Sequence, residues 1–272
     1  MPTFLSTVGF MVHALTRLTV AAMALCAVAL TARAQDPFEI QVYEYATVPK
    51  GWWNLETHLN YTARGTTVAA GGLYATQGQA HLTFELTRGI TDHFELAAYL
   101  VTSRHAGGPV GEIVGYRVRP RVKAPESWNW PVKVSLALEV GFPDSHYEEN
   151  STTLEVRPII EQSFGDWQID LNPVIGKALR GPNAADGWDF EPNARVAYSV
   201  TPKLDLSLEY YGATGLVTNW LPADQQVHQF YPGFDYQFSE TMVMNFGFSI
   251  PGTRAGDQSV IKMRLGVLFG GK

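Results

Sequence analysis

Four basic side chains alternate along one stretch of the chain, at Arg117, Arg119, Arg121 and Lys123. A spacing of two residues places all four on one face of a β-strand. Arg157 lies on the same face of a later expected strand. Rows of charge like this line pores, where they orient polar or anionic solutes at a constriction. The same charges can instead pair across a narrow interior and fill it. The sequence leaves both interpretations open.

A second polar set is expected to face the same interior and comprises Glu56, His58, His81 and Glu85. Two histidines on adjacent strands are possible metal ligands. The expected mature chain has no cysteine, however, and the histidines show no recognised ligand spacing. We therefore expect a hydrogen-bonded pair of histidines, no metal site and no cofactor.

A serine nucleophile needs a nearby histidine as its general base, so serines close to a histidine are the catalytic candidates. The candidates are Ser103 with His105, and the run Asp144-Ser145-His146. Both sets fall in polar loops and neither carries a hydrolase motif. We expect no catalytic residues and a protein that is not an enzyme. An outer-membrane lipid-modifying enzyme is the less favoured alternative.

The elements that position these residues follow a side-chain period of two. Residues 80–87 alternate apolar and polar, a short break follows, and the alternation resumes at residues 94–100. This pattern predicts a β-hairpin. Short breaks recur about every 37–38 residues, with a longer polar break between each pair. Hairpins with short turns at one end and longer loops at the other are typical of outer-membrane barrels.

The sequence thus predicts an all-β fold, a transmembrane antiparallel up-and-down β-barrel of about 12 strands after a cleaved signal peptide. Most charges fall on one face of the strands, and the opposite face is almost free of charge. Charge is costly on a surface that meets lipid, so the polar face is assigned to the lumen. The expected strands are residues 52–62, 79–103 as a hairpin, 113–123, 132–140, 153–163, 167–178, 188–200, 204–211, 227–238, 242–250 and 260–269.

Five prolines fall inside these strands, where each removes a ladder hydrogen bond. We expect them to mark bulges or bends, mostly near the short-turn rim. The five are Pro120, Pro158, Pro173, Pro192 and Pro232.

The chain divides into three parts. Residues 1–34 read as a signal peptide, with an apolar run and small residues before an expected cleavage after Ala34. Met1 and Met11 are both possible starts. Residues 35–50 are expected to be a periplasmic segment, an extra strand or a plug, and residues 51–272 the barrel. Cleavage would remove two arginines and Cys26, leaving 18 basic and 26 acidic residues, net −8. An acidic chain argues against nucleic-acid binding.

These features indicate the cell outer membrane as the location. The expected partners are outer-membrane lipid, a small-molecule solute and the barrel-assembly machinery. Tryptophans and tyrosines near the expected strand ends match the aromatic girdles at membrane interfaces. The last strand ends at Phe269, and a terminal aromatic resembles the assembly signal of bacterial barrels.

The mature start, DPFEIQVYEY followed by VPKGWWNLETHLNY, and the hairpin LTRGITDHFELAAYL resemble a family of uncharacterised bacterial outer-membrane proteins. That family is similar to proteins named for the MetA pathway of phenol degradation. The resemblance covers most of the mature chain and rests on the hairpin pattern. It implies an outer-membrane barrel that passes small or aromatic compounds, and it assigns no functional residue.

Overall fold

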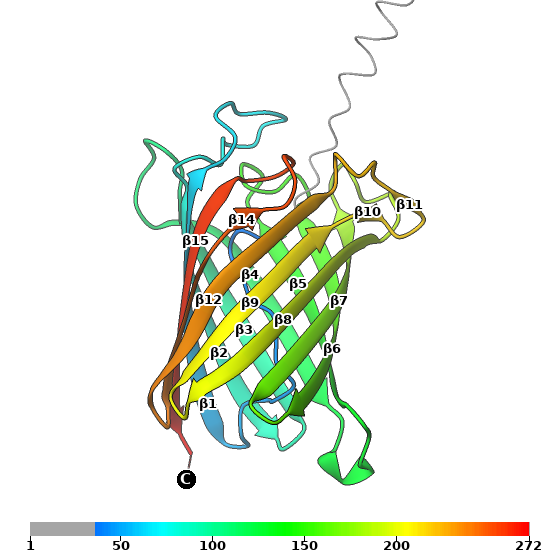
Figure 1. The fold of residues 1–272 in the computed structure, drawn as a ribbon. Coiled ribbons are helices and arrows are strands. Elements are labelled where there is room, and N and C mark those ends of the chain that lie inside the picture. The colour runs from blue at the N-terminus through cyan, green and yellow to red at the C-terminus, as the bar shows by residue number, and fades with distance from the viewer. Residues whose placement is uncertain (1–35, 272) are drawn as a thin grey trace, which may run out of the picture. The chain divides into compact units, whose positions relative to one another are not determined.

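The computed structural model describes residues 36–271, which belong to the unit Ala32–Lys272. These residues form a closed antiparallel β-barrel (Figure 1). The expected signal peptide, with Cys26, lies outside the described residues. Among residues 36–271 no helix is long and apolar enough to cross a membrane. The short 3-10 helix η1 (Glu126–Trp128) sits in a turn between two strands.

Twelve long strands build the wall over the described residues, and three short strands accompany them. The long strands follow the expected ranges closely. Their bounds are β1 Trp52–Arg64, β2 Ala80–Thr91, β3 Phe94–Arg104, β4 Glu112–Lys123, β5 Lys133–Pro143, β6 Thr152–Phe164, β7 Trp167–Arg180, β8 Asp189–Thr201, β9 Leu204–Ala213, β12 Val227–Ser239, β13 Met242–Phe248 and β15 Ser259–Gly270.

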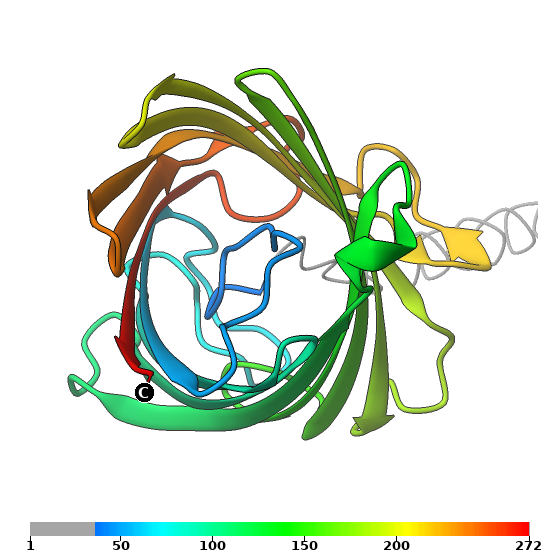
Figure 2. The same cartoon turned by 90° about the horizontal axis from the view of Figure 1, so that it is seen from below.

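Each long strand pairs with the next along the chain, and β1 pairs with β15 to close the sheet. The short strand β14 (Ile250–Pro251) continues the line of β13 after Ser249 and also pairs with β12. The short strands β10 (Gly215–Leu216) and β11 (Asn219–Trp220) form a small hairpin in a long loop. Figure 2 shows the closed ring of strands end-on. Closure leaves no long unpaired edge.

The two faces of the wall have opposite character, as expected. Leu86 on β2 is 40% exposed on the outside, whereas its neighbour Glu85 is 2% exposed. The same alternation runs along β1, where Leu59 is exposed and His58 and Asn60 are buried. An outward surface of leucine, valine and phenylalanine suits hydrocarbon, and a charge there would have no compensating solvent. The strands thus direct their charged side chains into the lumen.

The strand prolines were expected to mark bulges or bends, and the expected bulges are not found at Pro158 and Pro173, whereas the bends stay a prediction. On either side of Pro158 and Pro173 the register is unchanged, with Val156 opposite Ile175 and Ile160 opposite Leu171. Pro173 also lies directly opposite Pro192 on β8. The register shifts fall elsewhere, for example between Gly89 and Thr91 beside a short turn. A proline that forfeits one ladder bond is accommodated because the flanking pairs hold the register.

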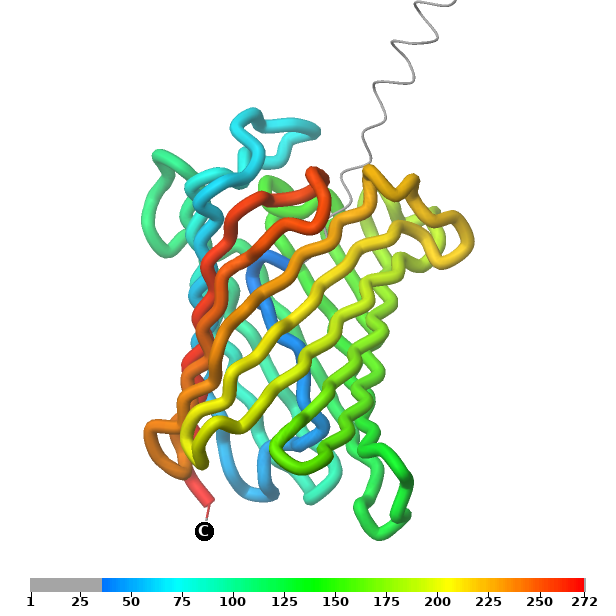
Figure 3. The backbone as a smooth tube through the Cα atoms, in the orientation of Figure 1, coloured from blue at the N-terminus to red at the C-terminus, as the bar shows by residue number. Residues whose placement is uncertain are grey.

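Residues 36–50, hereafter the lumen segment, lie inside the barrel rather than in its wall. Figures 2 and 3 show this blue segment within the ring of strands. It has no strand among the described residues. Its apolar and aromatic side chains are buried, notably Phe38, Ile40, Val42, Tyr43 and Tyr45. The segment meets β1 at the short-turn end, where Gly51 donates a backbone hydrogen bond to Gly89.

A charge on the outer face near mid-strand is expected to destabilise the barrel strongly. Leu86 lies midway along β2 and faces outward. Leu86→Arg should lower the free energy of unfolding in lipid vesicles by about 2–4 kcal/mol, because arginine loses hydration there. Trp128→Arg, in the exposed turn, should cost roughly 0–1 kcal/mol. Urea titration of the refolded proteins measures both, and equal costs would contradict a lipid-facing outer surface.

Candidate functional site

The basic row on β4 points into the lumen, and each of its three arginines pairs with acidic side chains. Arg117 donates to Asp36 of the lumen segment and to Glu139 Oε1, 3.0 Å away on β5. Arg119 donates to Glu85 on β2 and lies 3.3 Å from Glu95 Oε1. These groups therefore pair along the inner face of neighbouring strands and with the lumen segment.

Arg121 connects the wall to the backbone of the lumen segment. Its Nε donates to Glu95 at 2.7 Å. Its Nη1 and Nη2 donate to the carbonyl oxygens of Glu44 and Ala46, at 3.1 and 2.7 Å. A guanidinium is suited to this task because it presents several donors in a fixed plane. Arg121 is thus a support for the segment rather than an open wall charge.

Tyr43 is the central side chain of the lumen segment. Its ring lies 4.5 Å from the guanidinium carbon of Arg119 and 4.4 Å from that of Arg157. A cation over an aromatic face is stabilised by the ring quadrupole, more so where water is excluded. The Tyr43 hydroxyl donates to Glu39 and lies 3.0 Å from the Tyr99 hydroxyl. One aromatic side chain thereby joins several charges on the wall.

Asn172 on β7 fixes the backbone of the same residue. The Tyr43 amide donates to Asn172 Oδ1 at 2.7 Å, and Asn172 Nδ2 donates to the Tyr43 carbonyl at 3.0 Å. A carboxamide has the donor and acceptor needed to pair with a peptide group in this way. Asn172 is fully buried. The pair holds the segment against the wall midway along β7.

Other wall residues satisfy the remaining backbone groups of the lumen segment. Lys262 on β15 donates to the Ile40 carbonyl at 3.3 Å and to Glu209. Arg157 donates to the Gln41 carbonyl at 3.2 Å. The Val48 amide donates to Glu95 Oε2 at 2.6 Å. A chain with no ladder partners needs such donors and acceptors when it is buried.

A cavity of about 500 Å³ lies in the lumen between the lumen segment and the wall, and its lining comes from β1 to β4 as well as from β8, β9, β12, β13 and β15. Its lining reaches the short turns at Lys203 and Glu240. Charges of both signs surround it: Arg195 pairs with Asp235 at 2.8 Å, and Arg264 pairs with Glu56 at 2.9 Å. The lining is therefore polar and water-compatible.

The nine residues expected to line a pore all lie on lumen-facing positions, and the structure divides them into two groups. Arg119, Arg121, Glu56 and Glu85 line the cavity at the short-turn end. The others contact the lumen segment, the wall or the loop end. The Nζ atom of Lys123, for example, lies 5.1 Å from the centroid of the Tyr45 ring.

The two histidines do not form the expected pair. His81 Nδ1 lies 3.0 Å from the Ser103 hydroxyl, and the His81 ring packs edge-on against Phe38. His58 lies instead beside Glu56 and Glu85. The expected pairing was wrong because Thr83, rather than His81, lies directly opposite His58 on β2.

Of the catalytic candidates, Ser103 does not pair with the histidine that follows it in the sequence. Ser103 contacts His81 rather than His105, and His146 Nδ1 lies 2.9 Å from Asp144. His105 and His146 both stack on Tyr74, at centroid distances of 4.0 and 5.0 Å. The two loop histidines thus form an aromatic cluster with Tyr74 at the long-loop end of the barrel.

Tyr147 completes this cluster beneath the loops. Burial raises the pKa of Tyr147 to about 12, so its hydroxyl is protonated at neutral pH. That hydroxyl donates to Glu112 at 3.1 Å. The Tyr147 ring packs against Phe38 of the lumen segment. The upper end of the segment is therefore covered by loop side chains.

Sequence reasoning missed the residues that hold the segment. Tyr43 and Glu39 were visible in the stretch 35–50, but that stretch has no periodicity to indicate its neighbours. Asn172 gave no signal, since one asparagine on a polar strand face is ordinary. Lys262 and Glu209 were recognisable as lumen-facing residues, but their pairing depends on the curvature of the wall.

No protein-family model and no curated protein matches the sequence. Two solved porins are similar in structure. The KdgM porin superposes with a TM-score of 0.52 at 7% identity, covering 80% of this chain and 99% of the porin. The NanC porin gives 0.52 at 8% identity, covering 81% and 100%.

The chain has the fold of an outer-membrane β-barrel. At such low identity the likeness shows the fold alone. The fold and the apolar outer face together locate the protein in the outer membrane. The solute of either porin is not transferred to this barrel.

Weakening the contacts of Tyr43 should loosen the lumen segment while the wall stays intact. Asn172→Ala removes two buried hydrogen bonds of about 1 kcal/mol each, which corresponds to a roughly 30-fold larger open population of the segment. The readout is the rate at which an impermeant thiol reagent modifies Val42→Cys. Cys26 falls in the expected signal peptide, so this is the single thiol of the expected mature chain.

Asn193→Ala is the matched control for this experiment. Asn193 lies directly opposite Asn172 on β8, and its Oδ1 has no hydrogen-bond partner among residues 36–271. The control should leave the modification rate within about twofold of the parent. Equal acceleration by the two variants would show that general loosening of the wall, rather than loss of the Tyr43 contacts, exposes residue 42.

Proposed function

We propose that this barrel is a passive channel for small solutes, with the lumen segment as its constriction. The observation that carries the proposal is the cavity of about 500 Å³ beside the segment. It is polar, it is lined by charges of both signs, and its lining reaches the short-turn rim. Such a lining replaces part of a solute's hydration shell while it crosses.

The proposed path runs through this cavity, between the lumen segment and the wall. Solutes there would pass Arg195, Arg264 and Asp235 before reaching the narrow part of the lumen. The basic row on β4 borders the path only through Arg119 and Arg121. Passage of larger solutes requires displacement of the segment, because Tyr43 and its partners occupy the lumen beside the cavity.

The alternative function is a non-transporting structural or surface barrel with a lumen closed by its own charges. The dense pairing around Arg117, Arg119 and Arg121 favours it, since these ion pairs and the segment occupy space that a wide pore would leave to water. A lumen filled by side chains is common in narrow barrels. Conductance separates the two functions.

The solute class follows from the lining. Paired charges favour small polar or zwitterionic solutes over large neutral ones. Acidic residues outnumber basic ones in the lining, and its four arginines provide the donors for an anionic group. The resemblance to proteins named for the MetA pathway of phenol degradation adds small aromatic compounds to this proposal. Tyr43 and Met242, both at the cavity, offer apolar contact for an aromatic ring.

Deleting residues 36–50 is expected to raise the single-channel conductance several-fold in planar bilayers. The parent barrel should give a small current through the cavity, and the deletion should open the rest of the lumen. No current from either protein would overturn the channel proposal and leave the closed barrel. Current from the deletion alone would make the segment a complete plug.

Ion selectivity provides an independent test with a mild variant. Lys203 lies in a short turn, is exposed and lines the cavity. Lys203→Glu should shift the reversal potential in a salt gradient toward cations, because it reverses a charge at the mouth of the proposed path. Arg104→Glu, at the other end of the barrel on β3 and away from the cavity lining, is the control and should shift it less. Equal shifts would contradict the proposed path.

A further inference from the structure

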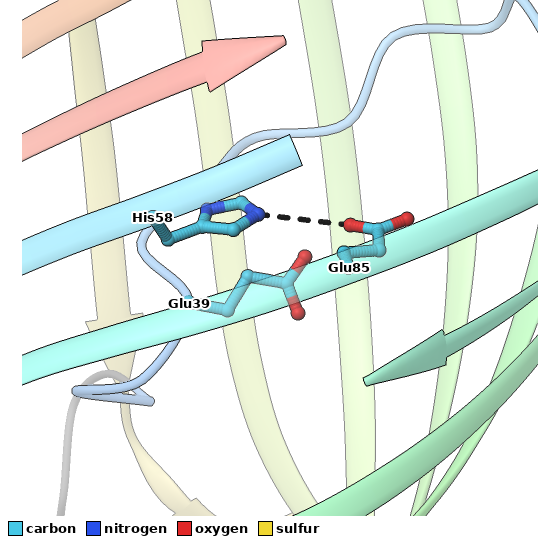
Figure 4. A group of neighbouring side chains, drawn as sticks. All are labelled: Glu39, His58 and Glu85. Atoms are coloured by element: carbon cyan, nitrogen blue, oxygen red, sulfur yellow. Dashed lines mark ion pairs between the residues drawn. The ribbon is translucent and has the colours of Figure 1, made fainter. Parts of the chain in front are cut away.

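Three side chains with metal-ligating atoms converge where the lumen segment crosses β1 and β2. They are Glu39 of the segment, His58 of β1 and Glu85 of β2, and one ligand atom from each lies within 4.8 Å of the others. Figure 4 shows the three side chains turned toward one another. All are buried, with 4%, 0% and 2% exposure respectively. Of these three residues only Glu85 also lines the cavity of the proposed channel.

The spacing of the donor atoms fits an ion better than a hydrogen bond. His58 Nε2 lies 3.6 Å from Glu85 Oε2, beyond ordinary hydrogen-bond length. Donors on a tetrahedral Zn²⁺ lie roughly 3.4 Å apart, since the bonds to nitrogen and oxygen are about 2.0–2.2 Å. Small side-chain adjustments bring all three ligands into range. Glu56 Oε2, 3.7 Å from the same nitrogen, is a possible fourth ligand.

The facing atoms are unsatisfied in the described part of the chain. Among residues 36–271, the two ring nitrogens of His58 have no hydrogen-bond partner. The same holds for Oε2 of Glu85. Buried polar atoms are normally paired, so an orphaned imidazole beside an orphaned carboxylate oxygen needs an explanation. A bound cation accounts for the nitrogen and the oxygen that face each other.

The second carboxylate oxygen of Glu85 and one oxygen of Glu39 accept hydrogen bonds that orient the cluster. Glu85 Oε1 accepts from Arg119 and, at 2.7 Å, from the Thr87 hydroxyl. Glu39 Oε1 accepts from the Tyr43 hydroxyl. Contacts of this kind fix the ligands of metal sites and raise affinity. The nearby positive charge of Arg119 and Arg121 is offset in part by Glu95, which accepts from both.

We propose that Glu39, His58 and Glu85 bind one divalent transition-metal ion, of the Zn²⁺ type, and that this ion ties the lumen segment to the barrel wall. Imidazole nitrogen with carboxylate oxygen suits Zn²⁺, whereas Ca²⁺ and Mg²⁺ prefer oxygen alone. Two carboxylates with a neutral histidine balance the charge of the ion. Glu85 and Glu56 line the cavity, so the ion can enter from the short-turn end. The site does not depend on whether the barrel conducts.

Zinc binding to the purified barrel tests the site directly. The protein is stripped with a chelator and titrated with Zn²⁺ in a calorimeter, and bound zinc is counted by elemental analysis. We expect one equivalent for the parent. Loss of an outer-contact residue typically weakens metal sites 10–100-fold. Loss of a ligand in His58→Gln or Glu39→Gln should therefore weaken binding by about 100-fold or more.

Control variants separate this site from other histidines. His105→Gln with His146→Gln removes the loop histidines, and His81→Gln removes the second buried histidine. Both proteins should still bind one zinc. Folding of every variant is checked by circular dichroism. Glu39 lies on the lumen segment, so the effect of Glu39→Gln on zinc binding does not depend on assembly of the wall.

A second measurement reports the tie between segment and wall. Zn²⁺ should slow modification of Val42→Cys in the parent background at least several-fold and should leave the rate unchanged with Glu39→Gln. No zinc bound to the parent, or unchanged binding in His58→Gln, would overturn the proposal. Either result would leave His58 as a buried side chain beside Glu56 and Glu85 with no bound ion.

Discussion

Exclusion of charge from the lipid-facing surface is the constraint on which the rest of this structure depends. A strand that crosses hydrocarbon can place polar side chains only on its inner face. With the outer face apolar, the charges of twelve strands collect in one lumen, where water is scarce. An unpaired charge there is costly, so arginines and carboxylates on neighbouring strands must meet. The ion pairs of Arg119 with Glu85 and of Arg195 with Asp235 are a consequence of that constraint.

The lumen segment is a second consequence. A lumen crowded with donors and acceptors provides partners for a stretch of chain that has no strand neighbours. Backbone carbonyls at Ile40, Gln41 and Glu44 accept from Lys262, Arg157 and Arg121. The aromatic ring of Tyr43 fills the space between guanidinium groups that would otherwise repel one another. The segment and the wall charges therefore stabilise each other, and neither is well satisfied alone.

This mutual dependence relates stability to function. The segment leaves a polar cavity between itself and the wall, which is the basis of the proposed path. A metal ion at Glu39, His58 and Glu85 would strengthen the attachment at the edge of that path, where Glu85 lines the cavity. Arg121 likewise holds the segment and lines the cavity, so retention of the segment and passage of solutes share residues.

The strands, the turns, the antiparallel barrel and the direction of each face could be predicted from the sequence. This was possible because a period of two and the cost of charge in lipid act locally, residue by residue. Arg117, Arg119 and Arg121 were identified as lumen side chains on those grounds alone. Their contacts, in contrast, became visible in the folded barrel. The placement of residues 36–50, the pairing of Asn172 with Tyr43 and the meeting of Glu39 with His58 depend on curvature and closure of the wall. Those features bring residues far apart in the chain within bonding distance, and no local pattern records them.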